Sequence, residues 1–130
     1  MRLVLDASAL ASWLMPDEDG ADLGRALATA EEIAAPWLLW AEIRNILIVG
    51  ERRDRLPQGV ADEVAEALDG LGIALDTGPS HVAVMALARR HGLTVHDALY
   101  LELALRRGAS LATRDRALVA AAQAEQVPMI

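Results

Sequence analysis

The sequence contains no cysteine, no lysine and no phenylalanine. The absence of cysteine excludes disulfides and thiolate metal sites, and it fits a protein of the reducing cytoplasm, which is where we expect this one. Three tryptophans and one tyrosine are the whole aromatic content, so the core should be aliphatic and rich in helix. Because lysine is missing, arginine supplies every positive side chain apart from histidine, and arginine suits bidentate contacts with phosphate.

Long apolar runs are missing as well. No run approaches the roughly 20 residues that would span a bilayer, and no basic segment precedes an apolar one as in a secretory signal. There is no low-complexity segment, clear repeat or long linker, so residues 1–130 should form a single domain. The net charge of −7 disfavours a protein that coats nucleic acid through bulk electrostatics, although a local basic patch stays possible.

Short apolar runs alternate with helical patterns along the chain. Strands are expected at 3–5, 33–35, 72–78, 111–112 and 127–130. Helices are expected at 8–15, 21–30, 38–53, 60–71, 80–91, 94–107 and 116–125. This alternation predicts right-handed crossovers and a parallel sheet with helices on both faces. Ligands of such sheets bind beyond the carboxyl ends of the strands.

Two acidic residues follow expected strands at that edge. Asp6 ends the first strand, and Asp115 comes two residues after the "SLAT" strand. Taken alone, each is more often a turn residue or a helix cap than a ligand.

Two further acids lie on apolar helix faces. Glu42 points in nearly the same direction as Leu38 and Ile46, where a lone carboxylate would be costly to bury. Asp97 shares a face with Leu101 and could be a first-turn acid that the helix dipole favours. For Glu42 the simpler alternative is a pair with an arginine.

The four acids together suggest more than four separate caps. Converging carboxylates repel one another unless a cation lies between them. Ligands that are all oxygen, without cysteine or a nearby histidine pair, suit Mg²⁺ or Mn²⁺ and not Zn²⁺. A cation held in this way can activate water and polarise a phosphoryl group, which is what phosphodiester hydrolysis needs.

Four pieces of the chain, "LVLDASAL", "WAEIRNIL", "LTVHDALYLELALRRG" and "LATRDRAL", resemble in order and spacing a PIN-domain ribonuclease, specifically the VapC toxins of type II toxin–antitoxin systems. The resemblance implies a three-layer α/β/α fold with a central five-stranded parallel sheet. It also implies a metal-dependent endoribonuclease that leaves a 5′-phosphate and a 3′-hydroxyl. Its metal-binding and catalytic acids would be Asp6, Glu42, Asp97 and Asp115. Ser8 and Thr113 match the supporting hydroxyl positions.

The resemblance further implies partners. They are a VapB-like antitoxin, an RNA substrate and a second copy of the chain, with no membrane. Candidate RNA-binding residues are Arg114 and Arg116, which flank an acid, and Arg52 and Arg53 in "GERRDRLP". An acidic cleft should be inhibited by a partner that inserts an arginine. The tryptophans are expected in the core or at an interface, not as platforms for bases.

Other classes of protein fit less well. A phospho-receiver domain and a haloacid-dehalogenase phosphatase both need a lysine, and no glycine-rich phosphate loop is present. Two alternatives within the family remain open. One is a housekeeping PIN ribonuclease, and the other is an inactive PIN-like module that only binds a partner.

Overall fold

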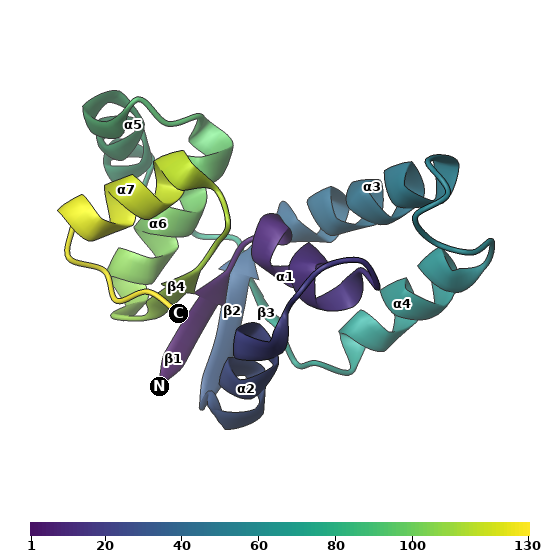
Figure 1. Ribbon diagram of the computed structural model, residues 1–130. Coiled ribbons are helices and arrows are strands. Elements are labelled where there is room, and N and C mark those ends of the chain that lie inside the picture. The colour runs from purple at the N-terminus through teal and green to yellow at the C-terminus, as the bar shows by residue number, and fades with distance from the viewer.

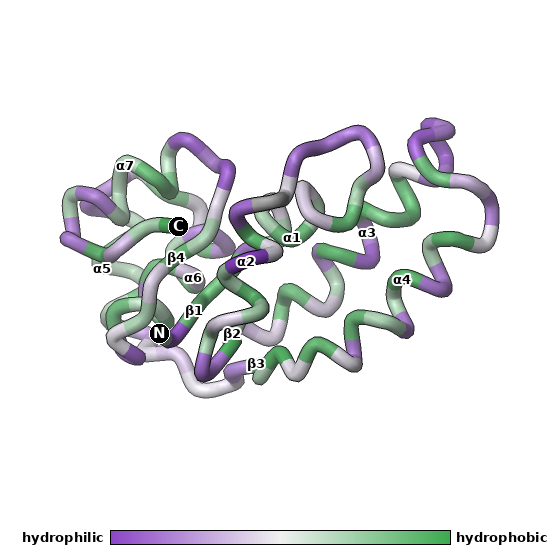
Figure 2. The backbone as a smooth tube through the Cα atoms, turned by 60° about the horizontal axis from the view of Figure 1, so that its bottom comes forward, coloured by the Kyte–Doolittle hydropathy of each residue, from purple (hydrophilic) through white to green (hydrophobic). Residues whose placement is uncertain are grey.

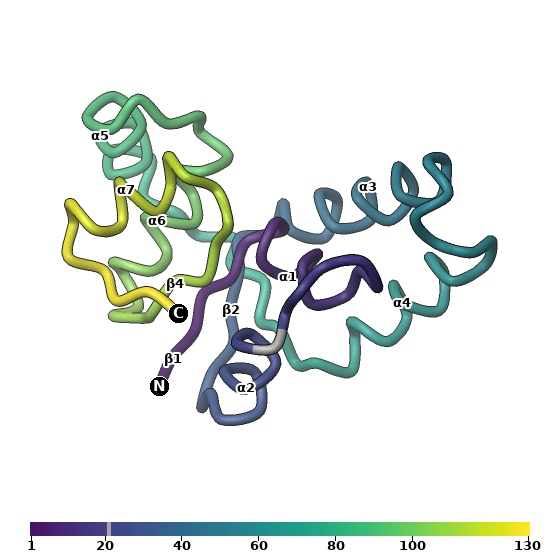
Figure 3. The backbone as a smooth tube through the Cα atoms, in the orientation of Figure 1, coloured from purple at the N-terminus to yellow at the C-terminus, as the bar shows by residue number. Residues whose placement is uncertain are grey.

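The computed structural model describes residues 1–20 and 22–130, and of Ala21 only its place in a helix (Figure 3). Strands are separated by helices, as predicted, and each connection between consecutive strands holds two helices (Figure 1). The strands are β1 (Arg2–Leu5), β2 (Glu32–Pro36), β3 (Ala74–Asp76) and β4 (Ser110–Ala112). The helices are α1 (Ala7–Leu14), α2 (Ala21–Thr29), α3 (Leu39–Arg52), α4 (Val60–Asp69), α5 (His81–His91), α6 (Val95–Arg107) and α7 (Arg116–Ala124).

The strands form one parallel sheet in the order β3-β2-β1-β4. In the register, Val4 of β1 lies between Ala34 of β2 and Leu111 of β4. Strand β1 is therefore central, and three of its four residues are buried, which explains its continuous apolar run. Figure 2 shows this apolar strand in green, in contrast to the hydrophilic connection between α3 and α4.

The expected fifth strand at 127–130 is wrong. The sheet has four strands, and this segment makes a single parallel bridge between Leu111 and Met129. Two hydrogen bonds form it: Leu111 N–H donates to the Pro128 carbonyl, and Ile130 N–H donates to the Leu111 carbonyl. The pairing does not extend toward α7, because Val127 N–H is already bonded to Ala122 O at the end of that helix, and Pro128 has no N–H.

Helices cover both faces of the sheet. Helices α5, α6 and α7 lie on one side, and α1 to α4 lie on the other (Figure 1). Aliphatic side chains from both layers and the sheet make one buried cluster that includes Leu5, Leu10, Ile43, Leu101 and Leu118. No helix in the described part of the chain is long and apolar enough to cross a membrane.

The predicted helix ends are largely confirmed. Ser80 and Thr94 cap α5 and α6 by accepting backbone N–H groups with their hydroxyls. Gly92 and Gly108 end the same helices in the left-handed conformation, where glycine carries no steric cost. These well-defined ends matter because they place the start of each helix, and therefore its first-turn side chains, relative to the sheet.

The tryptophans are not core residues. Trp13, Trp37 and Trp40 are 37%, 47% and 56% exposed, so none of them is in the core, and the other expected position, at an interface, stays a prediction. Their surroundings explain why they are exposed. Trp37 and Trp40 lie at the start of α3, which projects away from the sheet with α4, and Arg44 stacks over the Trp40 ring.

Candidate metal centre

The four predicted acids lie at the N-termini of four helices. Asp6 and Asp115 are the N-caps of α1 and α7, and Glu42 and Asp97 lie in the first turns of α3 and α6. In a parallel sheet, a helix that follows a strand begins near the carboxyl edge of that sheet. Each helix N-terminus also carries a partial positive charge that favours a carboxylate. The alternative that Asp6 and Asp115 are helix caps and Asp97 a first-turn acid is therefore correct. These same positions put the three acids at one edge of the sheet.

Asp6 is the most buried of the four, with only 4% of its surface exposed. Its Oδ1 accepts from Ala9 N–H at 2.9 Å and from the Ser8 hydroxyl at 2.7 Å, and its Oδ2 accepts from the Thr113 hydroxyl. Burial raises the pKa of the Asp6 carboxyl, the three hydrogen bonds oppose the rise, and the negative charge of Asp115 adds to it. Asp6 is thus held in place by neutral donors, and none of the described arginines or histidines pairs with it.

Ser8 and Thr113 connect the first strand to the fourth. Their hydroxyl oxygens are 3.4 Å apart, and Ser8 Oγ also accepts from the backbone N–H of Arg114 at 2.9 Å. Thr113 Oγ1 accepts from Asp115 N–H at 3.1 Å. The two hydroxyls therefore join Asp6 to the segment that leads into Asp115, and the supporting role that the family resemblance implies for them stays a prediction.

Asp97 and Asp115 complete the acidic side of the site. Asp115 caps α7 through Oδ1, which accepts from Leu118 N–H at 2.8 Å. Burial raises the pKa of the Asp97 carboxyl, and the charges of Asp115 and then Asp6 raise it further, whereas the Thr94 hydroxyl lowers it. The negative charges of Asp115 and Asp6 thus act against ionisation of the Asp97 carboxyl.

Glu42 has a different partner from the arginine that was considered for it. Its Oε1 accepts a 2.6 Å hydrogen bond from the hydroxyl of Tyr100 on α6, and the Tyr100 side chain is fully buried. Sequence reasoning missed Tyr100, although "HDALY" places it one helical turn after Asp97. The spacing of three residues was the signal, since residues i and i+3 share a helix face.

The donor set suits a hard divalent cation. Four carboxylates and two hydroxyls offer oxygen only, which is the preference of Mg²⁺ and Mn²⁺. Among the described residues, none of the four acids forms an ion pair with arginine, and no three acidic or histidine side chains are yet as close as the ligands of a bound ion. The four carboxylates lie at one edge of the sheet, and among the described residues they do not form a closed cage of ligands.

The predicted RNA-binding arginines lie at different distances from this site. Arg114 directly follows Thr113, and its guanidinium donates to the carbonyl oxygen of Asp19, while Arg116 is exposed on the first turn of α7. Arg52 and Arg53 are exposed at the far end of α3. Ten residues of helix separate Glu42 from Arg52, about 15 Å along the axis. Only the first pair is near enough to meet a phosphate beside the acids.

Comparison with known proteins agrees with this geometry. The family model for the PIN domain matches residues 3–124. The chain belongs to the PIN-domain family, as its motifs predict. Within that family it is similar to the ribonuclease VapC3 of Pyrobaculum aerophilum, with 38% identity over 122 residues that cover 91% of this chain and 92% of that protein.

Solved structures give the same result for the fold. PAE2754 from Pyrobaculum aerophilum is 27% identical with a TM-score of 0.74, covering 93% of this chain and 84% of its own. The FitAcB structure from Neisseria gonorrhoeae has a TM-score of 0.69 at 19% identity, covering 98% of this chain and 96% of that chain. The second likeness is one of fold alone.

Proposed function

We propose that this chain is a Mg²⁺- or Mn²⁺-dependent endoribonuclease whose active site is formed by Asp6, Glu42, Asp97 and Asp115. The observation that carries the proposal is that all four carboxylates lie at helix N-termini on one edge of the sheet, and that none of them pairs with an arginine among the described residues. The similarity to a ribonuclease, VapC3, supports RNA as the substrate.

The residues of the proposed site have two different roles. The four acids would hold the cation, which supplies neutralisation of phosphate charge and activation of the attacking water. Asp6 is fixed by Ser8, Thr113 and the backbone of α1, so it can keep its position when substrate arrives. Hydrogen bonds of this kind orient a ligand carboxylate and tune its basicity.

We propose that the ribonuclease is the toxin of a toxin–antitoxin pair that inhibits growth or translation, and that it acts in the cytoplasm. Support comes from the similarity to VapC3 and from the fold shared with toxin–antitoxin proteins, among them VapBC2 of Rickettsia felis. A VapB-like antitoxin would inhibit it by placing an arginine among the unpaired carboxylates, where a charge-assisted bidentate contact is favourable. A housekeeping ribonuclease is the alternative, and an adjoining small antitoxin gene would decide against it.

We also propose a homodimer. Exposed apolar side chains gather where α3, α5 and α6 begin, and a groove there is lined by residues that include Trp37, Met85 and Val95. Val82 on α5 is 76% exposed, which is unusual for valine. Light scattering of the wild type and of Val82→Glu tests this: we expect a dimer that the charged variant weakens, and a monomeric wild type would contradict it.

The activity is tested by incubating purified protein with a defined RNA in Mn²⁺ and in excess EDTA. We expect cleavage only with metal, and fragments that carry a 5′-phosphate. The inactive partner-binding alternative predicts no cleavage in either condition. Undiminished cleavage in EDTA, also present in Asp97→Asn prepared in parallel, would contradict the metal-dependent mechanism.

A further inference from the structure

The hydroxyl of Tyr100 lies among the acids of the proposed centre, although the tyrosine ring belongs to the core. The ring is 2% exposed and packs in the main aliphatic cluster. Phenylalanine would fill the same space without a polar atom. A buried tyrosine hydroxyl instead needs a partner, because burial without a hydrogen bond costs free energy. The partner it has is a carboxylate from another helix.

This hydrogen bond joins two of the four helices that carry acids of the site. Tyr100 is on α6, one turn after Asp97, and its hydroxyl donates to Glu42 Oε1 on α3 at 2.6 Å. Glu42 Oε2 has no hydrogen bond to any described residue. One carboxylate oxygen is therefore fixed by a hydrogen bond, and the other accepts none from the described residues.

We propose that Tyr100 is a positioning residue of the metal centre: its hydroxyl holds Glu42 in the orientation that binds the divalent cation. The proposal rests on the proposed function above. A flexible glutamate must be ordered each time a cation binds, whereas one that is already hydrogen-bonded has lost most of that freedom. The alternative is that Glu42 serves only to satisfy a buried tyrosine.

The first test measures Mn²⁺ affinity by electron paramagnetic resonance titration of the full chain. Tyr100→Phe removes only the hydroxyl, and we expect the dissociation constant to rise about tenfold, the scale seen when a partner of a metal ligand is removed. The matched control is Ser12→Ala, which removes another buried hydroxyl that donates to Ala9 O, away from the acids. It should leave Mn²⁺ affinity unchanged.

The second test needs no variant at position 100. Because the chain has a single tyrosine, protein labelled with ¹³C at tyrosine Cζ gives one resonance that reports on Tyr100 alone. We expect Mg²⁺ to shift this resonance, with the same midpoint as metal binding measured by calorimetry. Glu42→Gln keeps an oxygen that can accept from the hydroxyl, but it should abolish the shift, because metal no longer reaches Tyr100 through a carboxylate.

The outcomes separate the two proposals. A wild type that binds neither cation contradicts the proposed function and the role of Tyr100 with it. A wild type that binds metal while the tyrosine resonance does not move, or while Tyr100→Phe binds Mn²⁺ as tightly as the wild type, contradicts the role of Tyr100 alone. If Tyr100→Phe does not fold, the resonance of the wild type decides.

Discussion

Helix α6 contributes one carboxylate to each of two groups, and the two groups differ in whether arginine neutralises their charge. Near its start, Asp97 lies with the acids of the proposed metal centre and meets no arginine in the described structure. Further along the helix, Glu102 is more deeply buried than Asp97 but is bonded to an arginine of the same helix. The same residue chemistry thus occurs once with its own counter-charge and once without.

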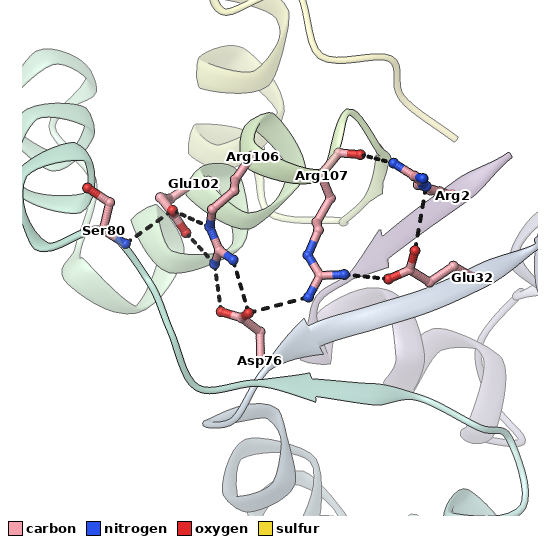
Figure 4. A network of polar contacts seen from close by, with 7 residues as sticks. All are labelled: Arg2, Glu32, Asp76, Ser80, Glu102, Arg106 and Arg107. Atoms are coloured by element: carbon pink, nitrogen blue, oxygen red, sulfur yellow. Dashed lines mark hydrogen bonds and ion pairs between the residues drawn. The ribbon is translucent and has the colours of Figure 1, made fainter.

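The second group is a closed network of ion pairs (Figure 4). Arg106 donates to Glu102 Oε1 at 2.8 Å and to Asp76 Oδ1 and Oδ2 at 3.1 and 2.6 Å, and Ser80 N–H adds a bond to Glu102. Arg107 and Arg2 extend the network to Glu32. Its effect on titration is the reverse of that at the metal centre, because the Arg106 guanidinium holds the pKa of the Asp76 carboxyl below its usual range.

The two regions differ in whether the protein itself neutralises their carboxylates. In the network, charges are balanced inside the protein, so the carboxylates stabilise the junction of α6 with β2 and β3 and need nothing from outside. In the metal centre, helix N-termini and hydroxyls hold the acids, but no positive side chain in the described part of the chain balances them. A site with unbalanced charge is suited to bind a positive ligand.

The largest effect should come from removing an acid of the metal centre. Asp6→Asn keeps the shape and the helix cap but removes a charge, and we expect RNA cleavage to fall by about a hundredfold or more, as when electrostatic support of a transition state is lost. Cleavage rates under Mn²⁺ measure this. The matched control is Asp22→Asn, an exposed acid paired with Arg25, and equal losses in both variants would show that the effect is one of overall charge.

Disrupting the network should lower the free energy of unfolding and should leave the chemistry of the metal centre unchanged. Arg106→Gln leaves Glu102 buried without its counter-charge, and we expect a loss of about 3 kcal/mol in the free energy of unfolding. Urea denaturation measures it. Arg25→Gln, which removes an exposed pair, should change stability by less than about 1 kcal/mol. A loss no larger in Arg106→Gln than in this control would mean that the network does not stabilise the fold.

Metal should stabilise the wild type and fail to do so when the centre is damaged. At a concentration a hundredfold above its dissociation constant, a cation that binds only the folded state adds about 2.7 kcal/mol. Thermal melting with EDTA and with Mn²⁺ should show this gain in the wild type and much less of it in Asp6→Asn. Identical gains in the two proteins would mean that Asp6 only caps α1 and does not bind the cation.

The smallest effect concerns pH. The folded-state pKa of Asp6 is raised, so the stability that its protonated form contributes is present below the unfolded pKa, near 3.8, and is lost as pH rises through the folded pKa. In EDTA, Asp6→Asn should therefore melt slightly above the wild type at pH 7, and the difference should disappear at pH 3. A variant that is less stable at pH 7 would show that hydrogen bonds to the carboxylate outweigh the repulsion.

Much of this contrast was predictable from sequence, and the reasons are local. Asp6, Asp97 and Asp115 were predictable because each stands at a pattern boundary, where a strand ends or a helix begins, and Glu42 stood out on an apolar helix face. The PIN family follows from the same residues in their order, and it is confirmed.

The remainder depends on contacts between distant residues. Tyr100 and Glu42 are 58 positions apart, and Arg106 and Asp76 are 30 apart, so no local pattern joins them. The absence of a fifth strand could not be predicted either, because it depends on the hydrogen bond from Val127 N–H to the end of α7, which keeps this N–H out of the sheet. Periodicity indicates which face a residue occupies, but it does not say which neighbour it meets there.

The central claim is that the acids at the four helix N-termini bind a divalent cation, whereas those of the network do not. Calorimetric titration of Mn²⁺ into wild type, Asp6→Asn and Asp76→Asn tests it most directly, since both variants lose one carboxylate from the same sheet. The account predicts saturable binding by the wild type and by Asp76→Asn, with affinity at least about tenfold weaker in Asp6→Asn. Equal affinity in all three proteins would contradict it.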